Sequence, residues 1–162
     1  QFIEEAMRCN QTRPAYYFIG AVIISAILIL TGVSAFHAQE SERFRGRLSI
    51  LPVDFASLPN MSGSGVVTAE LRESLLTIEV AFEGLSTPAT GATIRNAARG
   101  RRGSVVLAVE IGTATDTTGR FSQIITLESA EIAELRQERY YLQIQTERNP
   151  DGEIRGWLLS AP

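Results

Sequence analysis

From residue 45 onward, hydrophobic and polar residues alternate in short stretches that turn-forming residues separate. The clearest stretch is 75–82, where hydrophobic residues occupy every second position and so share one face of a strand. The residues on this face are Leu76, Ile78, Val80 and Phe82. Comparable stretches, alternating or rich in β-branched residues, are 48–53, 66–71, 105–111, 121–127, 140–145 and 154–159. About seven short strands joined by regular turns predict an antiparallel β-sandwich or barrel.

One short helix is predicted between the strands at 121–127 and 140–145. Ser129 has the side chain of an N-cap, and Ile132 and Leu135 share one face of the segment that follows. Glutamates occupy the opposite, solvated face. The predicted fold class is therefore all-β with one short helix.

An uncharged, mainly apolar segment runs from residue 15 to 36. As a helix it would be roughly 33 Å long, which is enough to cross the hydrocarbon core of a membrane. Aromatic residues lie at both of its ends, as they do at membrane interfaces. We therefore predict a transmembrane helix over 15–37, a preceding tail over 1–14, a linker over 38–44 and an exported β domain over 45–162.

This apolar segment has two other possible interpretations besides a membrane anchor. A buried core helix of this length does not suit so small a domain. A cleavable signal peptide is favoured by the small residues at 33–35, but the apolar run exceeds the roughly 7–15 residues of a signal core. The flanking arginines do not fix the orientation. The layout of a signal anchor predicts a cytoplasmic N-terminus and a periplasmic β domain in a bacterial inner membrane.

Small residues recur along one side of the predicted helix. This stripe consists of Ala21, Ser25, Leu28 and Gly32. Small side chains let a second helix approach closely, so the stripe predicts a packing face toward another subunit. The alternative is that such residues are simply common in membrane helices.

The composition excludes several kinds of chemistry. The 15 basic residues are all arginine, and the chain has one histidine, His37, and one cysteine, Cys9. There is thus no Schiff-base or P-loop lysine, no zinc site of the Cys/His type and no disulfide within the chain. The net charge of −3 gives no electrostatic reason to expect nucleic acid. We predict a non-catalytic protein without a metal or a dedicated cofactor, in which any contact with pigment or lipid is peripheral.

Four arginines lie within eight residues, in a segment that also contains Gly100 and Gly103. They are Arg95, Arg99, Arg101 and Arg102. The segment predicts a mobile basic loop that docks to an acidic protein surface or to lipid headgroups, because the guanidinium fork suits carboxylate and phosphate. The alternative is a solvated loop without a partner.

Several segments have the residue types and spacing of a known extracellular module. These segments are 84–85, 93–95, 103–106, 133–136, 140–146 and 149–158. Together they resemble the CHRD domain, the module first named from chordin, over roughly residues 44–159. The most specific part is Gly-Glu-Ile-Arg-Gly at 152–156.

The chain departs from the CHRD pattern at three positions. Family members often carry histidines in a His-x-His and a His-Thr motif, which implies a metal-ligand cluster. Here those positions hold Thr93, Arg95 and Gln145, none of which is a good ligand for a transition metal. The resemblance therefore implies a fold that serves as a scaffold.

The family motif itself is predicted to be structural. Its residues are Tyr141, Thr146, Gly152, Glu153, Ile154, Arg155 and Gly156. Gly152 belongs to a turn, while Glu153 and Arg155 are two apart and so share one face of a strand, where they help to fix the register. A binding role for these residues is the alternative.

Taken together, an anchor with a packing stripe and a β domain without a catalytic set indicate an accessory subunit of a multi-subunit membrane complex. The expected partners are other subunits and the lipid bilayer. By analogy the host complex is expected to be a bacterial photosynthetic reaction centre with its light-harvesting antenna, although a respiratory complex fits the same features. The alternatives are a free-standing anchored module that binds a ligand or an adhesion partner, and an anchored hydrolase.

Overall fold

The computed structural model describes residues 41–50 and 60–162. The described residues form nine β-strands and one α-helix. The elements are β1 (Ser41–Ile50), β2 (Ser64–Arg72), β3 (Leu75–Glu83), β4 (Ala89–Asn96), β5 (Ser104–Val109), β6 (Gly119–Thr126), α2 (Ser129–Arg136), β7 (Tyr140–Thr146), β8 (Ile154–Trp157) and β9 (Leu159–Ala161).

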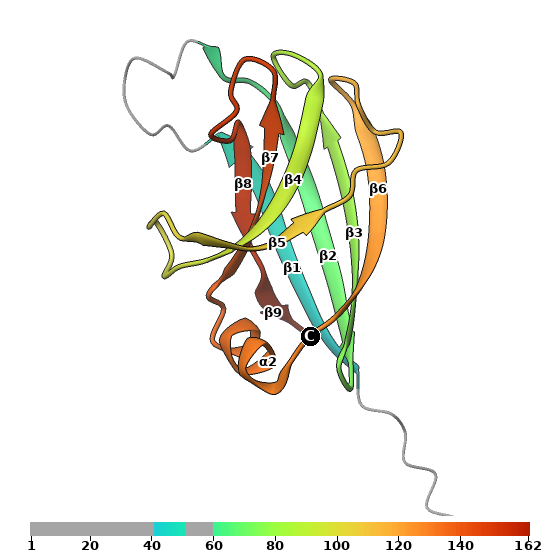
Figure 1. Cartoon of the computed structure of the whole chain (residues 1–162), viewed down its shortest axis with the longest axis vertical. Coiled ribbons are helices and arrows are strands. Elements are labelled where there is room, and N and C mark those ends of the chain that lie inside the picture. Colours follow the sequence, from blue (N-terminus) through green and yellow to red (C-terminus); the bar gives the residue numbers. More distant parts are fainter. Residues whose placement is uncertain (1–40, 51–59) are drawn as a thin grey trace, which may run out of the picture. The chain divides into compact units, whose positions relative to one another are not determined.

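The strands pair antiparallel in a single curved sheet (Figure 1). Their order is β5–β4–β7–β8–β1–β2–β3–β6. Strand β9 also pairs with β1, on the same edge of β1 as β8 but nearer the start of the strand. The two end strands are not paired by a ladder, but the N–H of Glu110 donates to Oε1 of Gln123 across the gap at 2.9 Å. The result is a nearly closed barrel, as the alternating pattern predicts.

The inner face of the sheet holds the hydrophobic core. The four alternating residues of β3 are all buried, which confirms the predicted inward face. Tyr140, Leu142 and Ile144 of β7 are also buried and belong to the same cluster. Helix α2 adds Leu135, which is fully buried. The helix has Glu128 rather than Ser129 at its N-cap, and the N–H of Glu128 donates to the carboxylate of Glu131 at 2.8 Å.

Strand β1 begins at Ser41, earlier than the sequence pattern predicts, so residues 41–44 are strand rather than linker. Its inward residues Phe44 and Leu48 are buried, while the arginines between them are exposed. Those arginines alternate with apolar residues because they belong to the outer face of a strand.

Strand β4 is missing from the predicted set. Its segment is rich in small residues and contains Gly91, so it has the composition of a connection, yet Ala92 and Ile94 lie in the core. The predicted last strand is in fact two strands, β8 and β9, separated by the buried Leu158.

The predicted transmembrane helix over 15–37 and its stripe of small residues lie outside the described residues. Within residues 41–50 and 60–162, no helix has both the length and the apolar character that crossing a membrane requires.

Candidate functional site

The outer face of β4, β7 and β8 carries a cluster of arginine, aromatic and amide side chains. Ladder pairing aligns them in two rows across the three strands. One row is Arg95, Tyr141 and Trp157, and the next is Thr93, Gln143 and Arg155. Because Ile94, Leu142 and Ile154 point into the core, these alternate residues point outward.

The centre of this face is an aromatic stack that holds a guanidinium group. The rings of Tyr141 and Trp157 have centroids 4.9 Å apart and are inclined by 39°. The Arg155 Cζ atom lies 5.8 Å from each ring centroid, which is cation–π distance. Tyr141 has no exposed area and Arg155 is 9% exposed. The sheet therefore buries a cation on its outer side.

Burial lowers the pKa of Arg155 below its usual value, although Tyr141 acts in the opposite direction. The charges of Arg102 and Arg95 lower this pKa further. Three cations therefore share one neighbourhood, and their mutual repulsion is felt at the most buried of them.

Most of the segment predicted as a mobile basic loop lies in a turn over residues 97–103, the arginine turn, which is held at both ends. At its start, the Ala97 N–H donates to the Arg139 carbonyl at 2.8 Å, and Trp157 Nε1 donates to the Ala97 carbonyl at 3.2 Å. At its end, the Gly103 N–H donates to the Tyr141 hydroxyl at 3.1 Å, and Arg95 donates to the Gly103 carbonyl at 3.0 Å. These bonds fix the turn over the aromatic stack.

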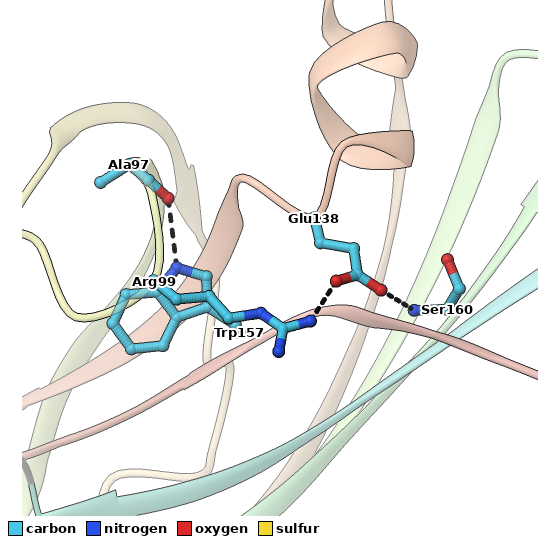
Figure 2. A network of polar contacts seen from close by, with 5 residues as sticks. All are labelled: Ala97, Arg99, Glu138, Trp157 and Ser160. Atoms are coloured by element: carbon cyan, nitrogen blue, oxygen red, sulfur yellow. Dashed lines mark hydrogen bonds and ion pairs between the residues drawn. The ribbon is translucent and has the colours of Figure 1, made fainter.

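The four arginines of this segment have different roles. Arg95 lies on β4 rather than in the turn. Arg99 forms an ion pair with Glu138, whose other oxygen accepts the N–H of Ser160 (Figure 2). Hydrogen bonds from Arg99 and from the Ser160 backbone lower the pKa of Glu138. Arg101 and Arg102 are exposed and form no ion pair with any described residue. Sequence alone could not distinguish these roles, because Glu138 is far away along the chain.

The structure brings together two of the three positions at which the resemblance implies metal ligands. Gln145 Nε2 donates to Thr93 Oγ1 at 2.9 Å, while the buried Oε1 of Gln145 accepts no hydrogen bond from the described residues. Arg95 lies two residues farther along β4, bonded to Gly103. Within residues 41–50 and 60–162 there is no group of three histidine, cysteine, aspartate or glutamate side chains placed to hold a metal ion.

Glu153 occupies a second polar site, which clamps three loops together. Its side chain is 2% exposed and accepts five hydrogen bonds, with lengths between 2.6 and 3.1 Å. The donors are the N–H groups of Ser62 and Ser86, the hydroxyls of Ser86 and Thr146, and the amide of Asn149. Burial raises the pKa of Glu153, but these hydrogen bonds outweigh it and hold the pKa below 4.5.

Glu153 and Arg155 do not share a face, contrary to the sequence prediction. Glu153 contacts Thr146, whereas Arg155 lies over Tyr141, and these two β7 residues point to opposite sides of the sheet. The alternation of inward and outward side chains along β8 does not extend to Glu153, because β8 begins only at Ile154. The sequence does not predict the roles of Ser62 and Ser86, because nothing near them in the chain marks them as hydrogen-bond donors to Glu153.

The two glycines of the motif are explained by backbone conformation and by the close approach of neighbouring atoms. Gly152 has φ of +111°, and a Cβ there would lie 2.3 Å from Cδ of Gln143. A Cβ on Gly156 would lie 2.3 Å from the carbonyl oxygen of Arg47. Only glycine fits these two positions.

The model of the CHRD domain family matches residues 52–158, more than half of the chain. The chain belongs to the CHRD domain family. No curated protein and no solved structure matches this CHRD domain. The match contains the Glu153 clamp, the aromatic stack and the arginine turn.

Proposed function

We propose that this CHRD domain is a non-catalytic docking module that binds an acidic surface of a neighbouring protein subunit in a membrane complex. The observation that carries the proposal is the exposed pair Arg101 and Arg102, presented on a turn that hydrogen bonds hold at both ends. Neither arginine forms an ion pair with the part of the chain described.

A pre-formed turn favours binding because little backbone entropy is lost when a partner docks. An exposed ion pair contributes only about 0–1 kcal/mol, so one arginine has a small effect. Two guanidinium groups side by side, partly desolvated by a partner, contribute more and set the orientation through bidentate bonds to carboxylates. Arg99 is left out of this contact set, because Glu138 already neutralises it.

In the same proposal, a transmembrane helix over 15–37 anchors the domain in a bacterial inner membrane, with the β domain in the periplasm. The stripe of Ala21, Ser25, Leu28 and Gly32 packs against a neighbouring helix. The proposed host is a photosynthetic reaction centre with its antenna, by analogy alone. A free-standing anchored binding module is the alternative function.

The docking proposal is tested by changing Arg101 and Arg102 together to glutamine in the full chain. Arg120→Gln is the matched control, because Arg120 is also exposed and forms no ion pair with the described residues. The double variant is expected to leave its complex at lower salt than the wild type, with an unchanged melting temperature, whereas the control stays attached. Attachment that is equal at every salt concentration refutes the proposed contact.

The anchor is tested separately, by changing Ala21 and Gly32 to leucine. Leucine is favourable in hydrocarbon, so insertion is retained, but its volume separates packed helices and weakens assembly. Native-gel mass after mild detergent extraction distinguishes the two functions. Migration of the wild type as a lone 17.7 kDa chain supports the free-standing module instead.

A further inference from the structure

Beneath the arginine turn, a group of cations lacks any acidic partner. The ion pairs among the described residues use Arg72, Arg99, Arg136 and Arg139. Arg95, Arg102 and Arg155 take part in none of them. The most buried of the three, Arg155, has nine tenths of its surface covered.

A buried guanidinium is normally paired with an anion, because desolvation of an unpaired charge costs several kcal/mol. At Arg155 the described structure supplies only the rings of Tyr141 and Trp157 and the Tyr141 hydroxyl. Cation–π contacts offset only part of that cost. The environment therefore stabilises the cation only in part.

Two N–H donors in this cluster are also unsatisfied. Nε of Arg155 and Nε of Arg95 are both buried and have no hydrogen-bond acceptor. Buried donors without acceptors are rare, because burial removes the water that would accept their hydrogen bonds. An acceptor that carries negative charge would satisfy the donors and neutralise the cluster together.

We propose that Arg95, Arg102 and Arg155 form an oxyanion-binding site at the base of the turn, with Tyr141 and Trp157 as its aromatic wall. The ligand is a carboxylate or another small oxyanion that accepts hydrogen bonds from guanidinium groups. This inference deepens the proposed function, because a carboxylate of the docked acidic partner is one source of the ligand. A free inorganic oxyanion is the other source.

The site has a built-in reporter, because Trp157 is the only tryptophan in the chain and lies against Arg155. The full chain in detergent is titrated with sodium phosphate, with sulfate and with a hexaglutamate peptide, at an ionic strength held constant with chloride. At least one of these anions is expected to change the Trp157 emission saturably. No saturable change with any of them overturns the proposal.

Variants assign the effect to the cluster. Arg155→Met keeps the length and the apolar stem of the side chain, and is expected to weaken oxyanion affinity at least tenfold. Arg102→Gln, at an exposed position, is expected to weaken it about three- to tenfold, and serves if the first variant does not fold. Arg120→Gln leaves the affinity unchanged. Equal affinity in the wild type and in every folded cluster variant overturns the assignment.

Competition distinguishes the two sources of the ligand. If phosphate displaces the partner, the partner's carboxylate occupies the site; if phosphate binds without displacing it, the site holds a free oxyanion. Both results support the oxyanion site. Because the titration uses the isolated chain, it stands even if the Arg101 and Arg102 variant shows no change in attachment, which refutes only the docking function.

Discussion

Replacing Glu153 with glutamine is expected to destabilise the domain at neutral pH, with a loss that shrinks in acid. Glutamine has the same shape but offers one acceptor oxygen instead of two. The two backbone N–H groups, from Ser62 and Ser86, must keep that oxygen, because they cannot become acceptors. The amide nitrogen then faces the hydroxyls of Ser86 and Thr146, which can turn to accept, and the amide of Asn149, whose bond is lost.

The magnitude follows from the five hydrogen bonds that Glu153 accepts. A hydrogen bond to a charged group contributes about 1.5–3 kcal/mol, and a neutral one about half as much. The loss of one bond and the weakening of the others are partly offset, because a neutral amide costs less to bury than a carboxylate, and Glu153→Gln is therefore expected to destabilise by about 2–3 kcal/mol. Glu153→Ala removes all five acceptor contacts and is expected to cost about 3–5 kcal/mol.

The pH dependence has a definite sign. The pKa of Glu153 is lowered in the folded state, so its ionised form stabilises the fold above the unfolded pKa of 4.5. That contribution is lost as the pH falls through the lowered folded-state pKa. The wild type therefore approaches the glutamine variant in stability at acidic pH.

Urea unfolding followed by Trp157 emission, at pH 7 and at a series of lower pH values, measures both effects. Glu147→Gln is the control, because Glu147 is exposed and its side chain forms no hydrogen bond or ion pair with the described residues; it is expected to stay within about 0.5 kcal/mol of the wild type. If Glu153→Gln is as stable as the wild type at pH 7, or if the difference does not narrow in acid, the clamp is not an ionised carboxylate.

Three further outcomes are expected. Gly103→Ala should destabilise by more than about 2 kcal/mol, because its Cβ would lie 1.8 Å from the Asn96 carbonyl oxygen. Gly100→Ala, whose Cβ meets no atom within 4 Å, should cost only about 1 kcal/mol for its φ of +78°, and thermal unfolding of both variants checks the contrast. Burial, with the charges of Glu131 and Glu134, raises the pKa of Tyr140 to about 12, so one tyrosine should titrate by ultraviolet absorbance well above 10. Because that pKa is raised, stability should fall between pH 10 and 12, and Tyr140→Phe should remove this fall. Treatment with EDTA should leave the melting temperature unchanged, and stoichiometric zinc or copper that survives dialysis would contradict the metal-free prediction.

The sequence predicted those parts of the fold that local periodicity determines. The prediction of strand β3 is correct because its apolar residues alternate without interruption. Strand β4 was missed because Gly91 and Ala92 give it the composition of a connection, and its pairing with β7 is a contact between distant segments. Tertiary pairing here overrides weak local preference.

The candidate site was predicted only in its residue types. The arginines and the motif were found from sequence, but their contacts are long-range. Arg99 pairs with a glutamate 39 positions away, and Glu153 accepts bonds from serines 67 and 91 positions away. The contact of Arg155 with the rings of Tyr141 and Trp157 needs the register of β7 and β8, which periodicity alone does not give.

The central place of β1 in the sheet decides how the domain responds to mechanical load. β1 is paired with β2 over nine positions on one edge, and with β8 and β9 on its other edge. A pull applied at Ser41 along the strand axis loads these hydrogen bonds together, in shear, instead of opening them one after another. If the segment before Ser41 is tethered, tension from that side therefore loads the fold in its strongest direction, while the end strands β5 and β6, which do not pair with β1, lie outside the loaded hydrogen bonds.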